Sequence, residues 1–142
     1  MAKKAELPSY KEKQQMLFGK NVDRAQLVQT AKMLLEAGWL SDAIDFFGKA
    51  EDSESLESVR RMAISEGDLF LFRKVLKTLG EDSAPAEQWR ELADMAKELG
   101  KLEFAREGYR MAGDRKKMDE IDRLMNPPES DEVVDAGYEG EP

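Results

Sequence analysis

The chain has 142 residues, of which 41% are hydrophobic and 37% charged, and its net charge is −8. This composition suits one domain with a core of ordinary size and argues against a wholly disordered chain. Cysteine and histidine are absent, which excludes disulfides and thiolate metal sites and removes the usual general base. The basic start lacks the apolar stretch of a signal peptide, and no apolar run is long enough for a membrane span, so we expect a cytoplasmic protein.

Apolar residues recur at three- and four-residue steps along the chain, which predicts about eight amphipathic helices. The first begins at Ser9, where Glu12 completes a capping box, and ends at Gly19. We expect Asn21 to cap the second helix. The later breaks lie at Gly38, 51–53, Gly67-Asp68, 80–85, Gly100, Gly113-Asp114 and 126–128. Short turns place neighbouring helices antiparallel, so the sequence predicts an all-α fold of helical hairpins.

Two segments, 38–50 and 100–112, share one pattern. Each begins with glycine and has an apolar residue two positions on, alanine at five, an aromatic residue at nine and alanine at twelve. Glycine permits a tight turn and alanine lets two helices approach closely. The segment around Gly67 fits less well, because Arg60 and Phe72 stand where small residues are expected. The chain is therefore built from an internal repeat.

This pattern resembles the tetratricopeptide repeat over about residues 24–114, since Trp89, Leu92, Ala93 and Ala96 also precede Gly100 in the order of that family's first helix. The resemblance implies a short α-solenoid of stacked antiparallel hairpins. We assign residues 21–125 to this repeat domain, including a C-terminal capping helix, and residues 1–20 to a basic segment with an N-terminal capping helix.

The resemblance also implies that a peptide or protein binds in a concave groove lined by the first helix of each hairpin. A carboxylate clamp of the kind found in the family is not expected, because no asparagine lies between Asn21 and Asn126. The residues at the family's inward positions are Ala25, Val28, Lys32, Leu35 and Glu36 in the first copy and Glu87, Arg90, Asp94, Lys97 and Glu98 in the third. The candidate partner-binding residues are Val28, Lys32, Leu35, Trp39, Arg90, Asp94 and Lys97. Arg90, Asp94 and Lys97 fit equally well as solvated neighbours on a helix face.

The aromatic residues divide between core and surface. Trp89 occupies a packing position of the family, whereas Trp39 beside the turn glycine serves either as a partly exposed binding anchor or as a cover for the hairpin end. Phe46 and Phe47 are adjacent and cannot share one helix face, so we expect Phe47 to pack within its hairpin. The remaining phenylalanines predicted to form an apolar surface for a partner are Phe46, Phe70 and Phe72.

Acidic residues concentrate at the C-terminal end. Six of the 30 lie in residues 128–142, which contain no lysine or arginine, and the other 24 are nearly balanced by 22 basic residues. We therefore expect 126–142 to be a disordered acidic tail. Three roles for this tail remain open: a solvating appendage, a short linear motif in which Val133, Val134 and Tyr138 are the binding residues, or an autoinhibitory strand over the basic end of the third hairpin. The remainder, even with its basic run at 115–117, lacks the positive excess that nucleic-acid binding needs.

Nothing in the sequence indicates catalysis, a cofactor or a metal. Carboxylate pairs such as Asp42 and Asp45 lie where a solvated helix face would place them, and no phosphate-binding glycine loop occurs. We predict a non-catalytic protein–protein interaction module, an adaptor or scaffold, with a protein or peptide partner and no nucleic acid or membrane. The alternatives are a small acidic secretion-type chaperone and a homo-oligomeric scaffold, which becomes the better interpretation if Met16, Leu17 and Phe18 are not buried.

Overall fold

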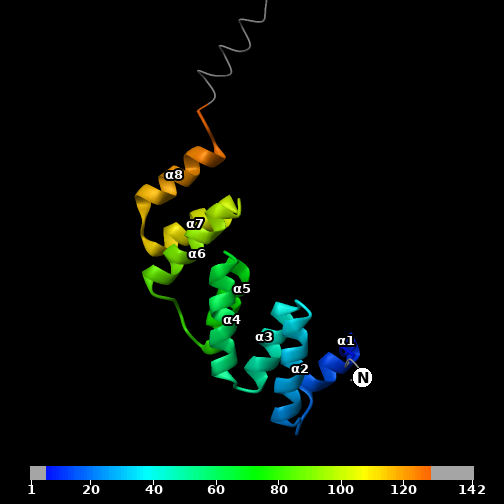
Figure 1. Ribbon diagram of the computed structural model, residues 1–142. Coiled ribbons are helices and arrows are strands. Elements are labelled where there is room, and N and C mark those ends of the chain that lie inside the picture. The colour runs from blue at the N-terminus through cyan, green and yellow to red at the C-terminus, as the bar shows by residue number, and fades with distance from the viewer. Residues whose placement is uncertain (1–5, 129–142) are drawn as a thin grey trace, which may run out of the picture.

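The computed structural model describes residues 6–128 (Figure 1). Residues 1–5 and 129–142 lie outside the described residues, and with them most of the predicted acidic tail. Every regular element within 6–128 is an α-helix, which confirms the predicted all-α class. The helices are α1 (Tyr10–Phe18), α2 (Arg24–Glu36), α3 (Leu40–Lys49), α4 (Ser53–Ser65), α5 (Leu69–Leu79), α6 (Ala86–Glu98), α7 (Leu102–Ala112) and α8 (Arg115–Met125).

The helices form hairpins, as the sequence predicts. Helix α2 packs on α3, α4 on α5 and α6 on α7, while α8 packs on α7. The first and second hairpins meet through α3 with α4 and α5, and the second and third through α4 with α6. The hairpins therefore follow one another in a row from the blue end to the orange end, with α1 against α3 near its start (Figure 1).

The same turn closes each hairpin. Its glycine lies in the left-handed region, with φ of 86° at Gly38, 60° at Gly67 and 78° at Gly100, a conformation that costs glycine little. The next residue donates its backbone N–H to a carbonyl five positions earlier, and these bonds are Trp39 to Leu34 (2.8 Å), Asp68 to Ala63 (2.9 Å) and Lys101 to Ala96 (2.8 Å). Because the turns are alike, α3, α5 and α7 all begin on the same side of the row.

The core consists of apolar residues buried within and between the hairpins. Trp89 is buried as predicted and meets Phe72 edge to face, with ring centroids 4.8 Å apart. Phe46 and Phe72 were predicted to lie on the surface, and both predictions are wrong. Phe46 and Phe47 are both buried, because α3 is covered by α2 on one side and by the second hairpin on the other. Of the three phenylalanines expected on the surface, only Phe70 is exposed.

Arg60 explains why the middle repeat departs from the pattern. Its side chain is buried between the second and third hairpins. The Nε atom donates to Gln88 Oε1 at 2.9 Å, and Nη1 donates to the Glu81 carboxylate at 2.9 Å. The guanidinium also lies 5.8 Å from the centre of the Phe72 ring. An arginine thus fills the place of a small residue and ties α4 to α6 and to the connector before it.

The helix starts follow the sequence with one exception. Ser9 and Glu12 form the predicted capping box, with bonds of 2.8 and 3.2 Å. The predicted cap at Asn21 is wrong. Asp23 caps α2 by accepting from the Ala25 N–H, whereas Asn21 has φ of 59° and belongs to the preceding turn.

Helix α1 is attached mainly by polar contacts, since none of its own residues is fully buried. Lys49 Nζ donates to three backbone carbonyls at the end of α1, those of Met16 (2.9 Å), Leu17 (2.6 Å) and Gly19 (2.8 Å). Met16 and Leu17 are half-buried against the first hairpin, but Phe18 is 77% exposed. Of the three apolar residues of the predicted N-terminal capping helix, Met16 and Leu17 therefore cover the first hairpin and Phe18 does not.

We predict that Gly67→Ala destabilises the protein more than Gly38→Ala. Both alanines would occupy a left-handed conformation, at a cost of about 1–2 kcal/mol. A Cβ at position 67 would also lie 2.6 Å from the backbone of Ala96, whereas one at position 38 meets nothing within 4 Å. We expect an additional loss of about 1–3 kcal/mol for Gly67→Ala from overpacking. Urea unfolding of the two variants measures the difference, and equal losses would show that the close approach is unimportant.

Candidate functional site

Exposed apolar side chains gather along one side of the row. Of the seven large hydrophobic residues that are exposed within 6–128, three belong to the N-terminal segment up to Phe18. The other four lie where the hairpins turn and where α8 ends, and they are Trp39, Phe70, Leu99 and Leu124. We call this surface the turn edge and define it as residues 36–42, 65–71, 98–104 and 124–125. Such clustering, unlike singly scattered apolar residues, marks an interaction surface.

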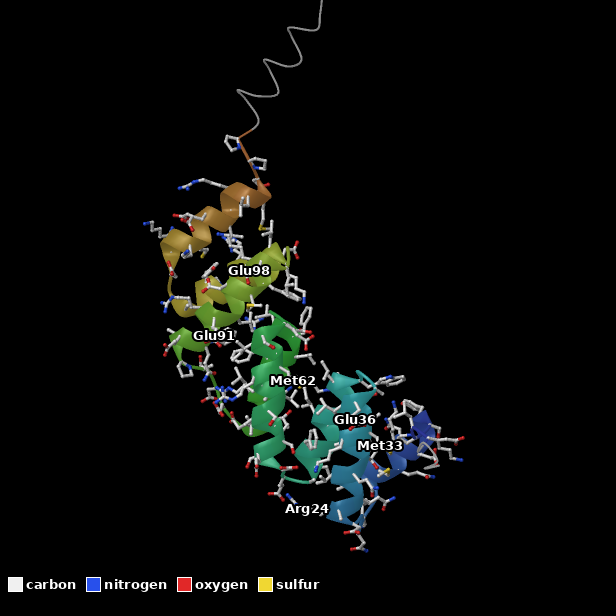
Figure 2. The ribbon with its side chains drawn as sticks, viewed as in Figure 1. Arg24, Met33, Glu36, Met62, Glu91 and Glu98 are labelled. Carbon is white, nitrogen blue, oxygen red and sulfur yellow. The ribbon has the colours of Figure 1, made fainter. Side chains whose placement is uncertain are left out.

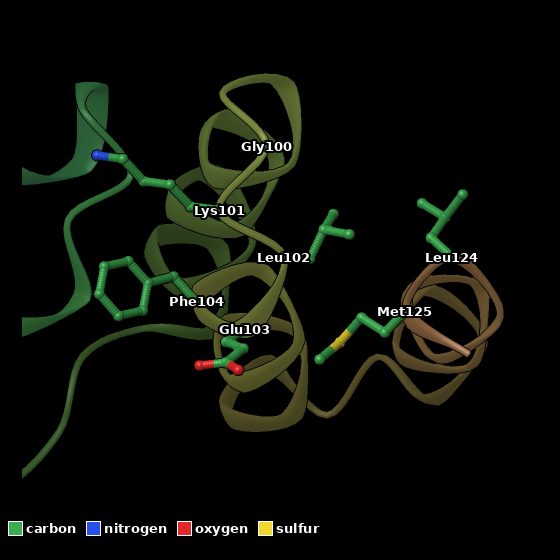
Figure 3. A pocket seen from close by; sticks show the side chains of 7 residues that line it. All are labelled: Gly100, Lys101, Leu102, Glu103, Phe104, Leu124 and Met125. Carbon is green, nitrogen blue, oxygen red and sulfur yellow. The ribbon is translucent and has the colours of Figure 1, made fainter. Parts of the chain in front are cut away.

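Two open grooves lie on the turn edge. The first has a volume of about 610 Å³ and lies between the first and second turns, with Trp39 and Phe70 among its lining residues. The second has a volume of about 590 Å³ and is lined by Gly100, Lys101, Leu102, Glu103, Phe104, Leu124 and Met125. Figure 3 shows Leu102 of α7 on the side facing Leu124 and Met125 of α8. The first groove therefore lies between two neighbouring turns and the second between α7 and α8, and large apolar side chains line both.

An aromatic pair joins the two grooves. Phe104 points away from α8 (Figure 3) and meets Phe70 edge to face, with ring centroids 5.2 Å apart and an angle of 88° between the planes. Phe70 lines the first groove and Phe104 the second. Apolar side chains therefore follow one another along the edge from the first hairpin to the last helix, and the Phe70–Phe104 pair forms a ridge between the two grooves.

Ionic contacts fix the spacing of the turns. Lys101 Nζ donates to the Glu66 carbonyl at 2.8 Å, which links the third turn to the second. One helical turn beyond the phenylalanine pair, Arg73 of α5 and Glu107 of α7 form an ion pair of 2.5 Å. Hydrogen bonds from Arg110 and from Arg73 lower the pKa of Glu107 to about 2. The ridge is therefore held by a charged contact directly behind it.

The first and second turns are joined in the same way. Lys74 of α5 donates to the backbone carbonyl of Ser41 at 2.9 Å and pairs with Asp45 at 3.0 Å. At the N-terminal end of the edge, Lys13 pairs with Asp42 at 2.9 Å and lies 4.7 Å from the centre of the Trp39 ring. This cation fixes one face of a tryptophan that is otherwise half exposed.

Four exposed glutamates border the apolar surface. Glu36 and Glu98 are the last residues of α2 and α6, Glu66 is the C-cap of α4, and Glu103 lies in the first turn of α7. None of these side chains is in an ion pair or hydrogen bond with another part of the chain that the structure describes. Three of them lie at helix C-termini, where the helix dipole is already negative and a carboxylate is unfavourable. The turn edge is therefore an apolar surface with an acidic border.

The candidate binding residues on α2 occupy a different surface. Val28 and Leu35 are half-buried and pack against the core of the first hairpin, and Lys32 is exposed. Helix α4, marked by Met62, lies between α2 and α6 in Figure 2. The structure therefore does not bring the α2 residues together with those of α6. Among the seven candidate partner-binding residues, only Trp39 lies on the turn edge, where it is joined by Phe70 from the predicted apolar surface.

Two of the candidate residues on α6 bind neighbouring helices. Arg90 lies 3.4 Å from Asp114 at the start of α8. Asp94 accepts a hydrogen bond from the buried Tyr109 hydroxyl of α7. Burial, with a further contribution from Asp94, raises the pKa of that hydroxyl well above its usual value. Both side chains thus act in packing α6 on the end of the row, and Lys97 beside them is half-buried.

Several residues of the turn edge were not identified from the sequence. The helical periodicity alone gives Leu99, Phe104 and Leu124 no role on the surface. Their signal is positional, because Leu99 immediately precedes a turn glycine and Phe104 follows it within the first helical turn. Large apolar residues at positions flanking a turn cannot all face the hairpin interior.

The described residues show no group of three or more acidic side chains arranged to hold a metal ion. Over the same range, no helix has both the length and the apolar character needed to cross a membrane. We compared the chain with protein-family models, curated proteins and solved structures, and none of the three comparisons gave a match.

We predict that Glu107→Gln lowers stability at pH 7 and that the difference from wild type disappears in acid. Because the folded-state pKa is about 2, below the value of about 4.3 for an unfolded glutamate, this carboxylate stabilises the protein above pH 4.3. That contribution is lost as the pH falls toward 2. After allowance for solvent screening, we expect about 1–2 kcal/mol at pH 7.

Denaturant unfolding between pH 7 and pH 2 measures this difference. Glu103→Gln is the matched control, because Glu103 is exposed on the same helix and has no ion pair among residues 6–128. A difference between Glu107→Gln and wild type that stays constant from pH 7 to pH 2 would contradict the assignment.

Proposed function

We propose that this chain is a non-catalytic protein–protein interaction module of the cytoplasm, an adaptor or scaffold built on tetratricopeptide-type hairpins. Its partner, a protein or peptide, binds along the turn edge. The observation that carries the proposal is the series of apolar side chains along one edge, from Trp39 through the Phe70–Phe104 pair to Leu124.

The exposure of these side chains supports binding over a purely structural role. Phe70 is 71% exposed and Trp39 is 50% exposed, so much of each ring contributes nothing to burial in the isolated chain. Rigid aromatic groups at the centre of an apolar patch are the residues that dominate binding energies at protein interfaces. The edge-to-face contact with Phe104 restricts the rotamers that the exposed Phe70 ring can adopt.

The chemistry of the chain favours binding over catalysis. A chain without histidine and cysteine lacks the commonest bases and nucleophiles. The glutamates of the turn edge come from three different turns, and each extends the border of the apolar surface. This arrangement supports recognition of a charged, partly apolar partner.

Self-association is the second candidate function, and the exposure of Phe18 favours it. This side chain is 77% exposed on α1, and Tyr10 on the same helix is 72% exposed. A contact between these residues and the turn edge of another copy would be heterologous and would link successive copies into an open chain. Light scattering across a range of protein concentrations separates the two candidate functions. A self-associating scaffold gains mass as the concentration rises, whereas a module that binds a different protein keeps the mass of one chain.

We predict that the double variant Trp39→Ser/Phe70→Ser loses the partner. Affinity capture from cells, quantified by mass spectrometry, should recover the partner at least about tenfold less with this variant than with wild type, since two anchor residues are removed. Circular dichroism should match wild type and urea unfolding should change little, because Phe70 is mainly exposed and Trp39 is half exposed.

Phe18→Ser is the matched control, because it removes an equally exposed aromatic group at a distance from the turn edge. It should retain the partner. Equal recovery with wild type and the double variant would contradict the proposed function, as would equal loss with Phe18→Ser.

A further inference from the structure

We infer that the turn edge accepts a basic amphipathic α-helix, with its apolar face on the two grooves and its lysine or arginine residues against the acidic border. This inference rests on the proposed function and specifies the chemistry of the partner. It follows from the spacing of the apolar groups and from the charge around them.

The spacing of the turns favours a helix over an extended peptide. Helices α3 and α5 pack on each other, as do α7 and α8, and packed helices lie about 8–10 Å apart. The apolar contact points on the two sides of each groove are therefore separated by about that interval. A helix advances about 10.5 Å in seven residues and returns to the same face. An extended strand covers the same distance in about three residues, which turns successive contacts to opposite faces. A helix with apolar residues at heptad-like spacing therefore matches the turn edge.

The ridge imposes a second requirement. The Phe70–Phe104 pair separates a groove beside Trp39 from a groove beside Leu124. An occupant must place one apolar cluster on each side of this ridge. Two consecutive apolar clusters on one helix face satisfy this condition. The side chains of a helix form rows with shallow grooves between them, and such a groove can receive the Phe70–Phe104 ridge.

The charge of the border selects a basic partner. The lysines at the grooves are engaged: Lys101 of the turn edge donates to the Glu66 carbonyl, and Lys74, which lines the first groove, contacts Ser41 and Asp45. The four border glutamates have no such partner within 6–128. The negative ends of α2, α4 and α6 are offset by the positive ends of α3, α5 and α7, which begin at the same edge, so the negative charge of the border comes from the four carboxylates. Lysine or arginine residues beside the apolar face of an incoming helix pair with these carboxylates and steer its approach.

The same charge argues against two other occupants. The segment 129–142 carries six acidic residues and no basic one, so it is repelled by the acidic border. A second copy in a twofold arrangement would set the same four glutamates against themselves. Both alternatives bring like charges together, whereas a basic helix brings opposite charges to the four carboxylates of the border.

The test titrates the full chain with an 18-residue peptide of leucine and lysine patterned as an amphipathic helix. Two further probes are a peptide with glutamate in place of lysine and a leucine–lysine peptide with the pattern scrambled. We expect micromolar binding of the patterned leucine–lysine peptide, read as a blue shift of Trp39 fluorescence that Trp39→Phe removes. The other two peptides should bind at least tenfold more weakly.

Variants assign the binding to the turn edge. Phe70→Ser should weaken the patterned peptide at least tenfold. Replacing the four border glutamates by glutamine, at positions 36, 66, 98 and 103, should also weaken it at least tenfold and reduce its dependence on salt. The matched control replaces four exposed glutamates away from the turn edge by glutamine, at positions 51, 54, 87 and 91. It has the same net charge and the same C-terminal segment as the variant of the four border glutamates. It should bind within twofold of wild type.

The outcomes separate this inference from the proposed function. Equal weakening by the control set, or stronger binding of the scrambled or glutamate peptide, overturns the inference of a basic helix. If the cellular partner is still lost with Trp39→Ser/Phe70→Ser, the proposed function stands and only the partner class is wrong. If the cellular partner is retained by that double variant, the proposed function itself fails, whatever the peptides do.

Discussion

The second turn lies directly against the backbone of α6, and the position of the third hairpin depends on this contact. A single Cβ atom at Gly67 would overlap Ala96, so the approach is possible only because position 67 has no side chain. The same approach brings the Glu66 carbonyl to Lys101 and the start of α5 to the start of α7. The aromatic ridge is thus a consequence of backbone packing, and it separates the groove between the first and second turns from the groove between α7 and α8.

Much of the fold follows from short-range patterns. Apolar residues at three- and four-residue steps and glycines after each stripe predict the hairpins, because both features act within one helix and its turn. The errors arise where two partners compete for one residue. Phe46 is buried because α3 is enclosed on two sides, which the periodicity of a single helix does not reveal. Asp23 displaces Asn21 as a cap because both residues suit the role, and the path of the chain leaving α1 decides between them.

Less of the candidate site could be predicted, because it joins residues that are far apart in sequence. Trp39 was identified as a possible anchor from its place beside a glycine, but its relation to Phe70 and Leu124 needs the stacking of the hairpins. The family resemblance directs attention to the first helices, whose α6 residues Arg90 and Asp94 contact α7 and α8. The acidic border has a sequence signal, since Glu36 and Glu98 both stand two residues before a turn glycine. That repetition gains meaning only when the turns are known to share one edge.

Because of the way it is attached, α1 can unfold locally while the rest of the chain stays folded. It buries no residue completely and is held largely by the Lys49 ammonium group on three carbonyls and by the Lys13 pair with Asp42. When α1 detaches, both lysines return to water at little cost, and the hairpins behind it keep their own contacts. Its amide hydrogens therefore exchange with solvent through a local opening, at a free energy well below that of global unfolding. The N-terminal helix behaves as a removable cover whose opening also frees the face of Trp39 that Lys13 occupies.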